Sequence, residues 1–361
     1  MDTRLRRARA AWGKPVSTVD TLDTGRIEPY LEAHLAGFKG PMHAEKFEGG
    51  QSNPTFLIEA ASGRYVLRRQ PPGQLLKSAH AVDREFRVMH ALAGTGVPVP
   101  KMYHLCGDRD VIGSLFYVME FCDGRILQDA ALPEVDNRQR TAMYDETNRV
   151  LATLHGVDLA AVGLTDYGKP GNYFERQVSR WSRQYRASEL AHLQPMEDLI
   201  DWLTQNMPAD DGRISLVHGD YRLGNLMWHP SEPKLVAVLD WELSTLGHPL
   251  ADLAYQCMRM RLPSKSRNPG LRGGLENVNR AELGIPTEKE YVAAYCRRRD
   301  IARIDKWEFH LAFSFFRLAA IAQGIAKRAV EGNAASRDAA WAGPAVAQLA
   351  AMGFKIAREG A

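Results

Sequence analysis

One β-rich island, from Ser215 to Leu239, interrupts the helical pattern that extends from about residue 137 towards the end of the chain. Apolar residues with helical spacing surround it, at residues 137–155, 173–190, 196–206, 287–298 and 306–330. The first third differs, because two strand patterns, Thr55–Ile58 and Arg64–Leu67, flank a turn there, and a third covers Leu115–Glu120. The chain therefore has one β-rich region at its start and a second one inside a helical region.

The order of these patterns predicts the fold class. With 361 residues, of which 45% are hydrophobic, the chain is long enough for two lobes or for one large two-layered domain. A β-rich first third followed by a helical remainder favours an α+β fold with two lobes. We expect the N-terminal lobe to cover residues 1–122 and the C-terminal lobe to cover residues 123–361.

Composition limits the partners that the chain is expected to have. The net charge of +3 is too small to indicate nucleic-acid binding. The most apolar stretch, Phe309–Val330, contains Arg317 and Lys327, so it predicts a buried helix and not a membrane span. The four cysteines are scattered and show no CxxC spacing, which is typical of a reduced, cytoplasmic protein with free thiols.

The densest polar cluster of the chain lies within the island, in the sequence LVHGDYRLGNLM at residues 216–227. Asp220 and Asn225 are both in this segment, and Asp240 follows at the end of the next strand pattern. A carboxylate, an amide and a second carboxylate in this order suit phosphoryl transfer. The first carboxylate orients a hydroxyl group and accepts its proton, while the amide oxygen and the second carboxylate hold Mg²⁺ on the phosphates.

These residues carry a family resemblance. The segment HGDYRLGN, at residues 218–225, closely resembles the catalytic loop of aminoglycoside and choline kinases. The segment LDWE, at residues 239–242, resembles their metal-binding strand end, and GHPLADLA, at residues 247–254, is a usual companion. The longer segments FEGGQSNPTFLI and AVLDWELSTLGHPLADLA most resemble the kinase-like domain fused to acyl-CoA dehydrogenases and its stand-alone bacterial relatives.

The resemblance implies a bilobal, protein-kinase-like fold and an ATP- and Mg²⁺-dependent phosphotransferase that acts on an alcohol group. Asp220 matches the catalytic aspartate, and Asn225 and Asp240 match the two metal ligands. His218 matches a histidine that supports the loop, and Glu242 matches a position that could support a second metal ion.

The resemblance also implies a nucleotide site in the N-terminal lobe. The residues assigned to it are Gly49, Gly50, Gln51, Ser52, Asn53, Arg68, Glu85, Met119, Glu120 and Cys122. Arg68 stands where kinases usually have a lysine, Glu85 is its expected ion-pair partner, and the register against Arg69 is open. The glycine pair would let backbone N–H groups approach the phosphates, and residues 120–122 would hydrogen-bond the adenine.

The acceptor is predicted from charge. Arg176 and Arg180 lie one turn apart on a helix, with Arg259 and Arg261 downstream, and they form either a solvated face or a wall that binds anions. The resemblance implies hydroxylated acyl-CoA chemistry, so a 4-hydroxyacyl-CoA is the expected acceptor. An acyl-CoA dehydrogenase is then a possible functional partner.

Other interpretations stay open at this point. The chain could be an aminoglycoside kinase or another small-alcohol kinase, a catalytically inactive kinase fold that serves as a binding module, or a protein kinase. Retention of Asp220, Asn225 and Asp240 argues against an inactive fold, and the short segment from Trp241 to Asp252 leaves no room for an evident activation loop. Asp252 and His155 are expected to be structural.

Overall fold

A computed structural model of the chain describes residues 22–47, 53–71, 81–331 and 341–359. The chain divides into two compact units. The N-terminal unit contains Met1–Leu127, Val162–Leu164 and Gly224–Ser244. The C-terminal unit contains Gln128–Ala161, Thr165–Leu223 and Thr245–Ala361. The two units are not separated by one boundary near residue 122, because part of the β-rich island belongs to the N-terminal unit. The lobe limits 1–122 and 123–361 stay a prediction.

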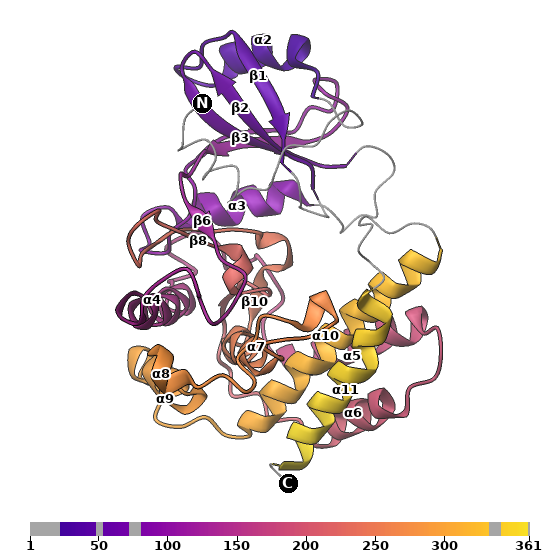
Figure 1. Cartoon of the computed structure of the whole chain (residues 1–361). Helices are drawn as coiled ribbons and strands as arrows, with labels where there is room; N and C mark the ends of the chain where they lie inside the picture. Colours follow the sequence, from indigo (N-terminus) through magenta and orange to yellow (C-terminus); the bar gives the residue numbers. More distant parts are fainter. Residues whose placement is uncertain (1–21, 48–52, 72–80, 332–340, 360–361) are drawn as a thin grey trace. The chain divides into compact units, whose positions relative to one another are not determined.

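The N-terminal unit is built on an antiparallel five-stranded sheet in the order β1-β2-β3-β5-β4 (Figure 1). The strands are β1 (Met42–Lys46), β2 (Thr55–Ala60), β3 (Gly63–Arg69), β4 (Met102–Cys106) and β5 (Phe116–Glu120). Two helices, α2 (Thr24–His34) and α3 (Val82–Leu92), belong to the same unit. A three-stranded sheet of β6 (Arg125–Ile126), β8 (Leu226–Trp228) and β9 (Leu235–Val238) completes it.

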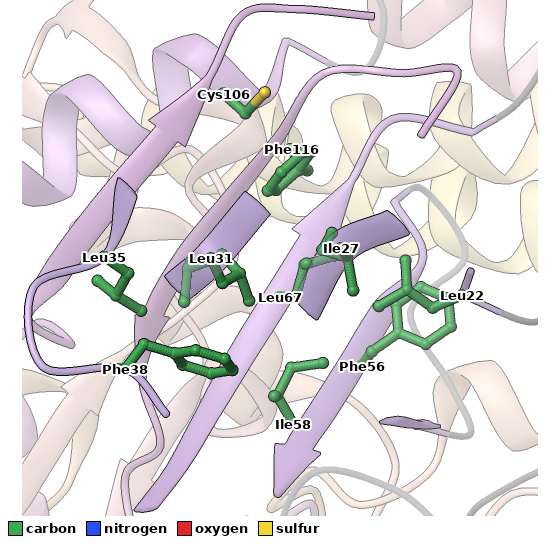
Figure 2. Close-up of a cluster of buried hydrophobic side chains, with 11 residues drawn as sticks. Leu22, Ile27, Leu31, Leu35, Phe38, Phe56, Ile58, Leu67, Cys106 and Phe116 are labelled. Atoms are coloured by element: carbon green, nitrogen blue, oxygen red, sulfur yellow. The ribbon is translucent and has the colours of Figure 1, made fainter. Parts of the chain in front are cut away.

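Figure 2 shows the apolar core between α2 and the five-stranded sheet. Ile27 and Leu31 lie one turn apart on α2 and are fully buried. They pack with Phe56 and Leu67, which face each other across β2 and β3, and with Phe116 of β5. This core covers one face of the sheet, so the alternate side chains of its strands can place polar groups on the opposite face.

The C-terminal unit is mainly helical. Its helices are α4 (Asn137–His155), α5 (Tyr173–Ser188), α6 (Gln194–Gln205), α7 (Leu250–Arg261), α8 (Arg280–Leu283), α9 (Glu288–Arg299), α10 (Trp307–Val330) and α11 (Ala342–Glu359). Helix α10 packs against α5, α7 and α11 (Figure 1). It is long and apolar enough to cross a membrane, but 89% of its most apolar window is buried inside the protein, as the sequence predicts for a core helix.

The predicted α+β, protein-kinase-like fold is confirmed, and the strands of the β-rich island divide between the two units. Its first strand, β7 (Ser215–Val217), pairs with β10 (Thr245–Gly247) in the C-terminal unit. Its other two strands, β8 and β9, pair with β6 in the N-terminal unit. The polar segment at residues 218–225 therefore runs from one unit into the other, with Leu223 as the last residue of the C-terminal part.

Candidate active site

A buried aspartate fixes the backbone of the loop that carries Asp220. The Asp252 carboxylate, on α7, accepts hydrogen bonds from the backbone N–H groups of His218 and Gly219, at 2.6 and 2.8 Å. Gly219 has φ +84°, a left-handed conformation that glycine adopts without steric cost. His155 lies 3.3 Å from Asp252 and 2.6 Å from the Tyr295 hydroxyl, so its polar groups are satisfied. The structural roles expected for Asp252 and His155 are confirmed.

Asp220 lies in a polar environment that keeps it ionised. Its Oδ2 atom accepts a hydrogen bond from Nε of Arg222 at 3.0 Å. Burial works to raise the pKa of Asp220, but the charge of Arg222, a hydrogen bond from Tyr255 and the charge of His218 outweigh it and hold the pKa below its usual value. An ionised carboxylate of this kind can orient a hydroxyl group and accept its proton.

Asn225 and Asp240 lie at the ends of the paired strands β8 and β9. Leu226 faces Val238 in this pair, and the Leu239 N–H donates to the Asn225 carbonyl at 2.9 Å. Asp240 follows with φ +65°, a left-handed conformation that aspartate tolerates better than most residues. The carboxylate of Asp240 and the carboxamide of Asn225 therefore start from neighbouring positions, and both supply the hard oxygen ligands that suit Mg²⁺.

Arg68 connects Asp240 to the helix α3. Its Nε lies 2.9 Å from Oε2 of Glu85, and its Nη2 donates to Oδ1 of Asp240 at 3.1 Å. Glu85 is almost fully buried and also accepts hydrogen bonds from Nδ2 of Asn53 at 2.7 Å and from the Tyr117 hydroxyl at 3.1 Å. The expected ion pair of Arg68 with Glu85 is thus present, and Asn53 supports the same carboxylate.

Arg69 is placed differently from Arg68. Neighbouring residues of a strand point to opposite faces of the sheet, so only one of the two arginines can reach Glu85. The Arg69 guanidinium lies over the Phe56 ring, 5.6 Å from its centroid, and the side chain is buried. The geometry therefore favours Arg68 as the residue at the position of the kinase lysine.

The other residues assigned to the nucleotide are spread along β5 and beyond it. Met119 is buried, and the Glu120 N–H already donates to the Lys101 carbonyl at 2.8 Å. Cys122 packs with Met227 and Ala237, and burial, with the nearby charge of Glu120, raises its pKa to about 12. Gly49, Gly50, Gln51 and Ser52 lie outside the described residues. The nucleotide roles of this set stay predictions.

The two arginines assigned to the acceptor differ in their surroundings. Arg176 donates to the backbone carbonyls of Lys169 and Pro170, at 2.7 and 3.2 Å, so its guanidinium holds a loop of its own unit. Arg180 is exposed and lies over the Trp181 ring, 5.5 Å from its centroid. Downstream, Arg261 forms an ion pair with Glu288.

The structure adds Arg222 and Tyr255 to the residues near Asp220, and it places there Arg259, which the sequence assigned to the possible anion-binding wall. Arg222 is part of the polar segment itself, and Tyr255 and Arg259 lie one turn apart on α7. All three influence one another electrostatically, and Asp220 is part of the same group. The signal available in the sequence was the four-residue spacing of Tyr255 and Arg259 directly after the GHPLADLA segment.

Comparison with known proteins identifies the family of the chain. Residues 43–305 match APH, the phosphotransferase enzyme family. Acyl-CoA dehydrogenase family member 10 of Mus musculus is 46% identical over 345 residues, a match that covers 95% of this chain and 32% of the mouse protein. The chain thus spans about a third of the length of that relative.

Solved structures give the same result. A Ralstonia eutropha protein assigned to the aminoglycoside phosphotransferases is 49% identical, with a TM-score of 0.85 and coverage of 94% of this chain and 99% of that one. A thermostable mutant of aminoglycoside phosphotransferase APH(4)-Ia, in ternary complex with AMP-PNP and hygromycin B, has a TM-score of 0.59 at 16% identity, with coverage of 93% and 98%. The first match extends over nearly the whole of both chains, and the second shows the shared fold. The chain belongs to the APH phosphotransferase family.

Proposed function

We propose that the protein transfers the γ-phosphoryl group of ATP to a hydroxyl group of a small metabolite, with Asp220 as the catalytic base. The observation that carries this proposal is the Asp220 carboxylate, hydrogen-bonded to Arg222, on a loop whose backbone is fixed by Asp252. An AMP-PNP complex of a protein with the same fold supports ATP as the donor.

Asp220 would act on the acceptor. Its carboxylate orients the hydroxyl group and takes its proton as the oxygen attacks the γ-phosphorus. The new bond joins that oxygen to phosphorus, the bond from the γ-phosphorus to the β–γ bridging oxygen breaks, and ADP leaves with the electron pair. Asn225 and Asp240 would hold Mg²⁺, which when bound neutralises charge on the phosphates. Arg68, fixed by Glu85, would bind a phosphate oxygen.

Replacing Arg68 by alanine tests the nucleotide part of the proposal. Loss of a charge-assisted hydrogen bond to phosphate should raise the ATP KM or lower turnover about tenfold or more. Glu85→Ala should act in the same direction and more mildly. Arg69→Ala is the matched control, because its side chain lies over Phe56 and away from Glu85. A large kinetic effect of Arg69→Ala with none for Arg68→Ala would contradict the assignment.

The acceptor is proposed to be a hydroxyacyl-CoA, for example a 4-hydroxyacyl-CoA. Two observations support an anionic acceptor over a polycation: Arg180 is exposed on α5, and Arg222 and Arg259 lie close to Asp220 in the C-terminal unit. A site for aminoglycosides would need carboxylates instead, to replace the water lost by several ammonium groups. The name of the mouse relative points to acyl-CoA chemistry in that protein, and an acyl-CoA dehydrogenase is the proposed functional partner.

Steady-state phosphorylation of a panel tests the acceptor. The panel contains hydroxyacyl-CoA esters of different chain length and hydroxyl position, together with kanamycin and choline. We expect kcat/KM for the preferred ester to exceed that for either cation by at least about a hundredfold. The positive charge of kanamycin or choline would lie near the arginines of the site, and such like-charge contacts cost several kcal/mol. A preference for kanamycin, in keeping with the assignment of the Ralstonia eutropha protein, would overturn the acceptor and leave the phosphotransferase proposal standing.

A further inference from the structure

Arg317 is a buried cation for which the described residues supply no anionic partner. It lies in the middle of α10 and is 5% exposed, and its Nε is buried without a hydrogen-bond partner. Among the residues that the structure describes, none forms a hydrogen bond or an ion pair with its guanidinium. A buried charge without such partners is costly and is rarely retained for stability alone.

Two aromatic rings hold this guanidinium in place. Its central carbon lies 5.6 Å from the ring centroid of Trp181 on α5 and 5.5 Å from that of Tyr255 on α7. Cation–π contacts of this kind fix the side chain in position but leave its charge uncompensated. Arg317 is therefore oriented by α5 and α7, while no described residue uses the hydrogen-bond donors of its guanidinium.

A second arginine, Arg259, follows Tyr255 by four residues on α7. Arg259 is half-buried, and within the described part of the chain its guanidinium too has no hydrogen bond or ion pair. Burial and the charge of Arg222 lower the pKa of Arg259, against the opposite effects of Tyr255 and Asp220. Tyr255 is thus within electrostatic reach of Arg317, Arg259 and the proposed catalytic base.

We propose that Arg317 and Arg259 form an oxyanion subsite that binds a carboxylate or phosphate group of the acceptor beside Asp220. This proposal rests on the proposed function for the identity of the bound molecule, although the subsite itself can be detected without turnover. Guanidinium groups bind both kinds of oxyanion through paired N–H donors. The residues lie on α7 and α10 of the C-terminal unit, whereas Arg68 and Glu85, the proposed nucleotide residues, lie in the N-terminal unit, so we assign the oxyanion to the acceptor and not to ATP.

Thermal unfolding tests the subsite without any assumption about the reaction. Arg317→Met removes the charge and keeps an unbranched side chain, so we expect its Tm to equal or exceed that of the wild type. With ADP and Mg²⁺ at saturation, inorganic phosphate should raise the Tm of the wild type and have a smaller effect on Arg317→Met and on Arg259→Gln. Arg328→Met is the matched control, since Arg328 is exposed on the same helix. A lower Tm for Arg317→Met, or an equal phosphate effect in all variants, would overturn the proposal.

Kinetics identifies the source of the oxyanion. For the preferred acceptor, Arg317→Met should raise KM about tenfold to a hundredfold, the loss expected for hydrogen bonds to a charged group, and leave the ATP KM within about twofold. Comparison of a hydroxyacyl-CoA with its hydroxyacyl-pantetheine analogue measures the contribution of the phosphates to acceptor binding. Comparison of a hydroxy acid with its methyl ester measures the contribution of the carboxylate. The variant should lose the preference shown by the wild type in one of these pairs. Retention of both preferences, or an effect confined to the ATP KM, would contradict an acceptor subsite.

Discussion

Asp220→Asn is expected to lower turnover about 10²–10⁴-fold, the usual contribution of a positioned general base. Asparagine keeps the shape of the side chain, but it cannot take the proton of the acceptor hydroxyl. The fold should persist, because Asp252 still holds the loop through the backbone N–H groups of His218 and Gly219, and the amide oxygen of asparagine can still accept the hydrogen bond from Arg222. The measurement combines steady-state turnover with thermal unfolding and ADP binding on the same preparation.

The control for this variant is Asp220→Glu, which keeps the charge and displaces it by one methylene group. Partial activity of Asp220→Glu, above that of Asp220→Asn, would show that ionisation and position both contribute. Turnover of Asp220→Asn within about threefold of the wild type would show that Asp220 is not the base, since loss of a true base is far more costly.

Asp240→Ala is expected to abolish Mg²⁺-dependent turnover, because it removes the only charged member of the proposed ligand pair with Asn225. Asn225→Ala should instead weaken the apparent affinity for Mg²⁺, since a neutral amide oxygen contributes less to binding a divalent cation than a carboxylate does. The measurement is turnover as a function of Mg²⁺ concentration at saturating ATP.

One alternative explanation of the Asp240→Ala result can be tested directly. Asp240 also binds Arg68, so the variant leaves that guanidinium with one carboxylate partner fewer. Arg68→Ala should change the ATP KM and leave the Mg²⁺ dependence intact if the two residues act separately. An unchanged Mg²⁺ titration in both Asp240→Ala and Asn225→Ala would remove these residues from the metal site.

Local sequence patterns predicted α4, α5, α6, α9 and α10 of the C-terminal unit, whereas α7, α8 and α11 were not among the predicted helices. The pattern at residues 137–155 coincides with α4 (Asn137–His155), and the Asp136 side chain caps that helix by accepting from the Gln139 N–H at 2.8 Å. Both the apolar spacing and the cap are local, so the sequence contains them in full. The sequence indicated the β-rich island but not the partners of its strands, because β7 pairs with β10 and β8 with β6, which is distant in the chain, and no local pattern encodes such pairing.

The candidate site likewise has features that local sequence predicts and features that depend on tertiary structure. The motif named Asp220, Asn225 and Asp240 as candidates from their types and spacing, and the backbone hydrogen bonds expected for Asp252 are present. The use of Arg176 to hold the carbonyls of residues 169 and 170 depends on the tertiary path of a loop. The isolation of Arg317 between Trp181 and Tyr255 depends on how α5, α7 and α10 pack, so its sequence context indicated only a charge within an apolar helix.

The central claim is that this chain transfers phosphoryl groups from ATP to an alcohol. The most direct measurement incubates the protein with γ-labelled ATP, Mg²⁺ and a hydroxyacyl-CoA panel, and then follows the label by mass spectrometry. We predict one labelled phosphoester for each ADP formed, with transfer lost without Mg²⁺ and reduced at least about a hundredfold in Asp220→Asn. ADP formation with the label only in inorganic phosphate for every hydroxylated compound, or transfer that Asp220→Asn leaves unchanged, would contradict this account.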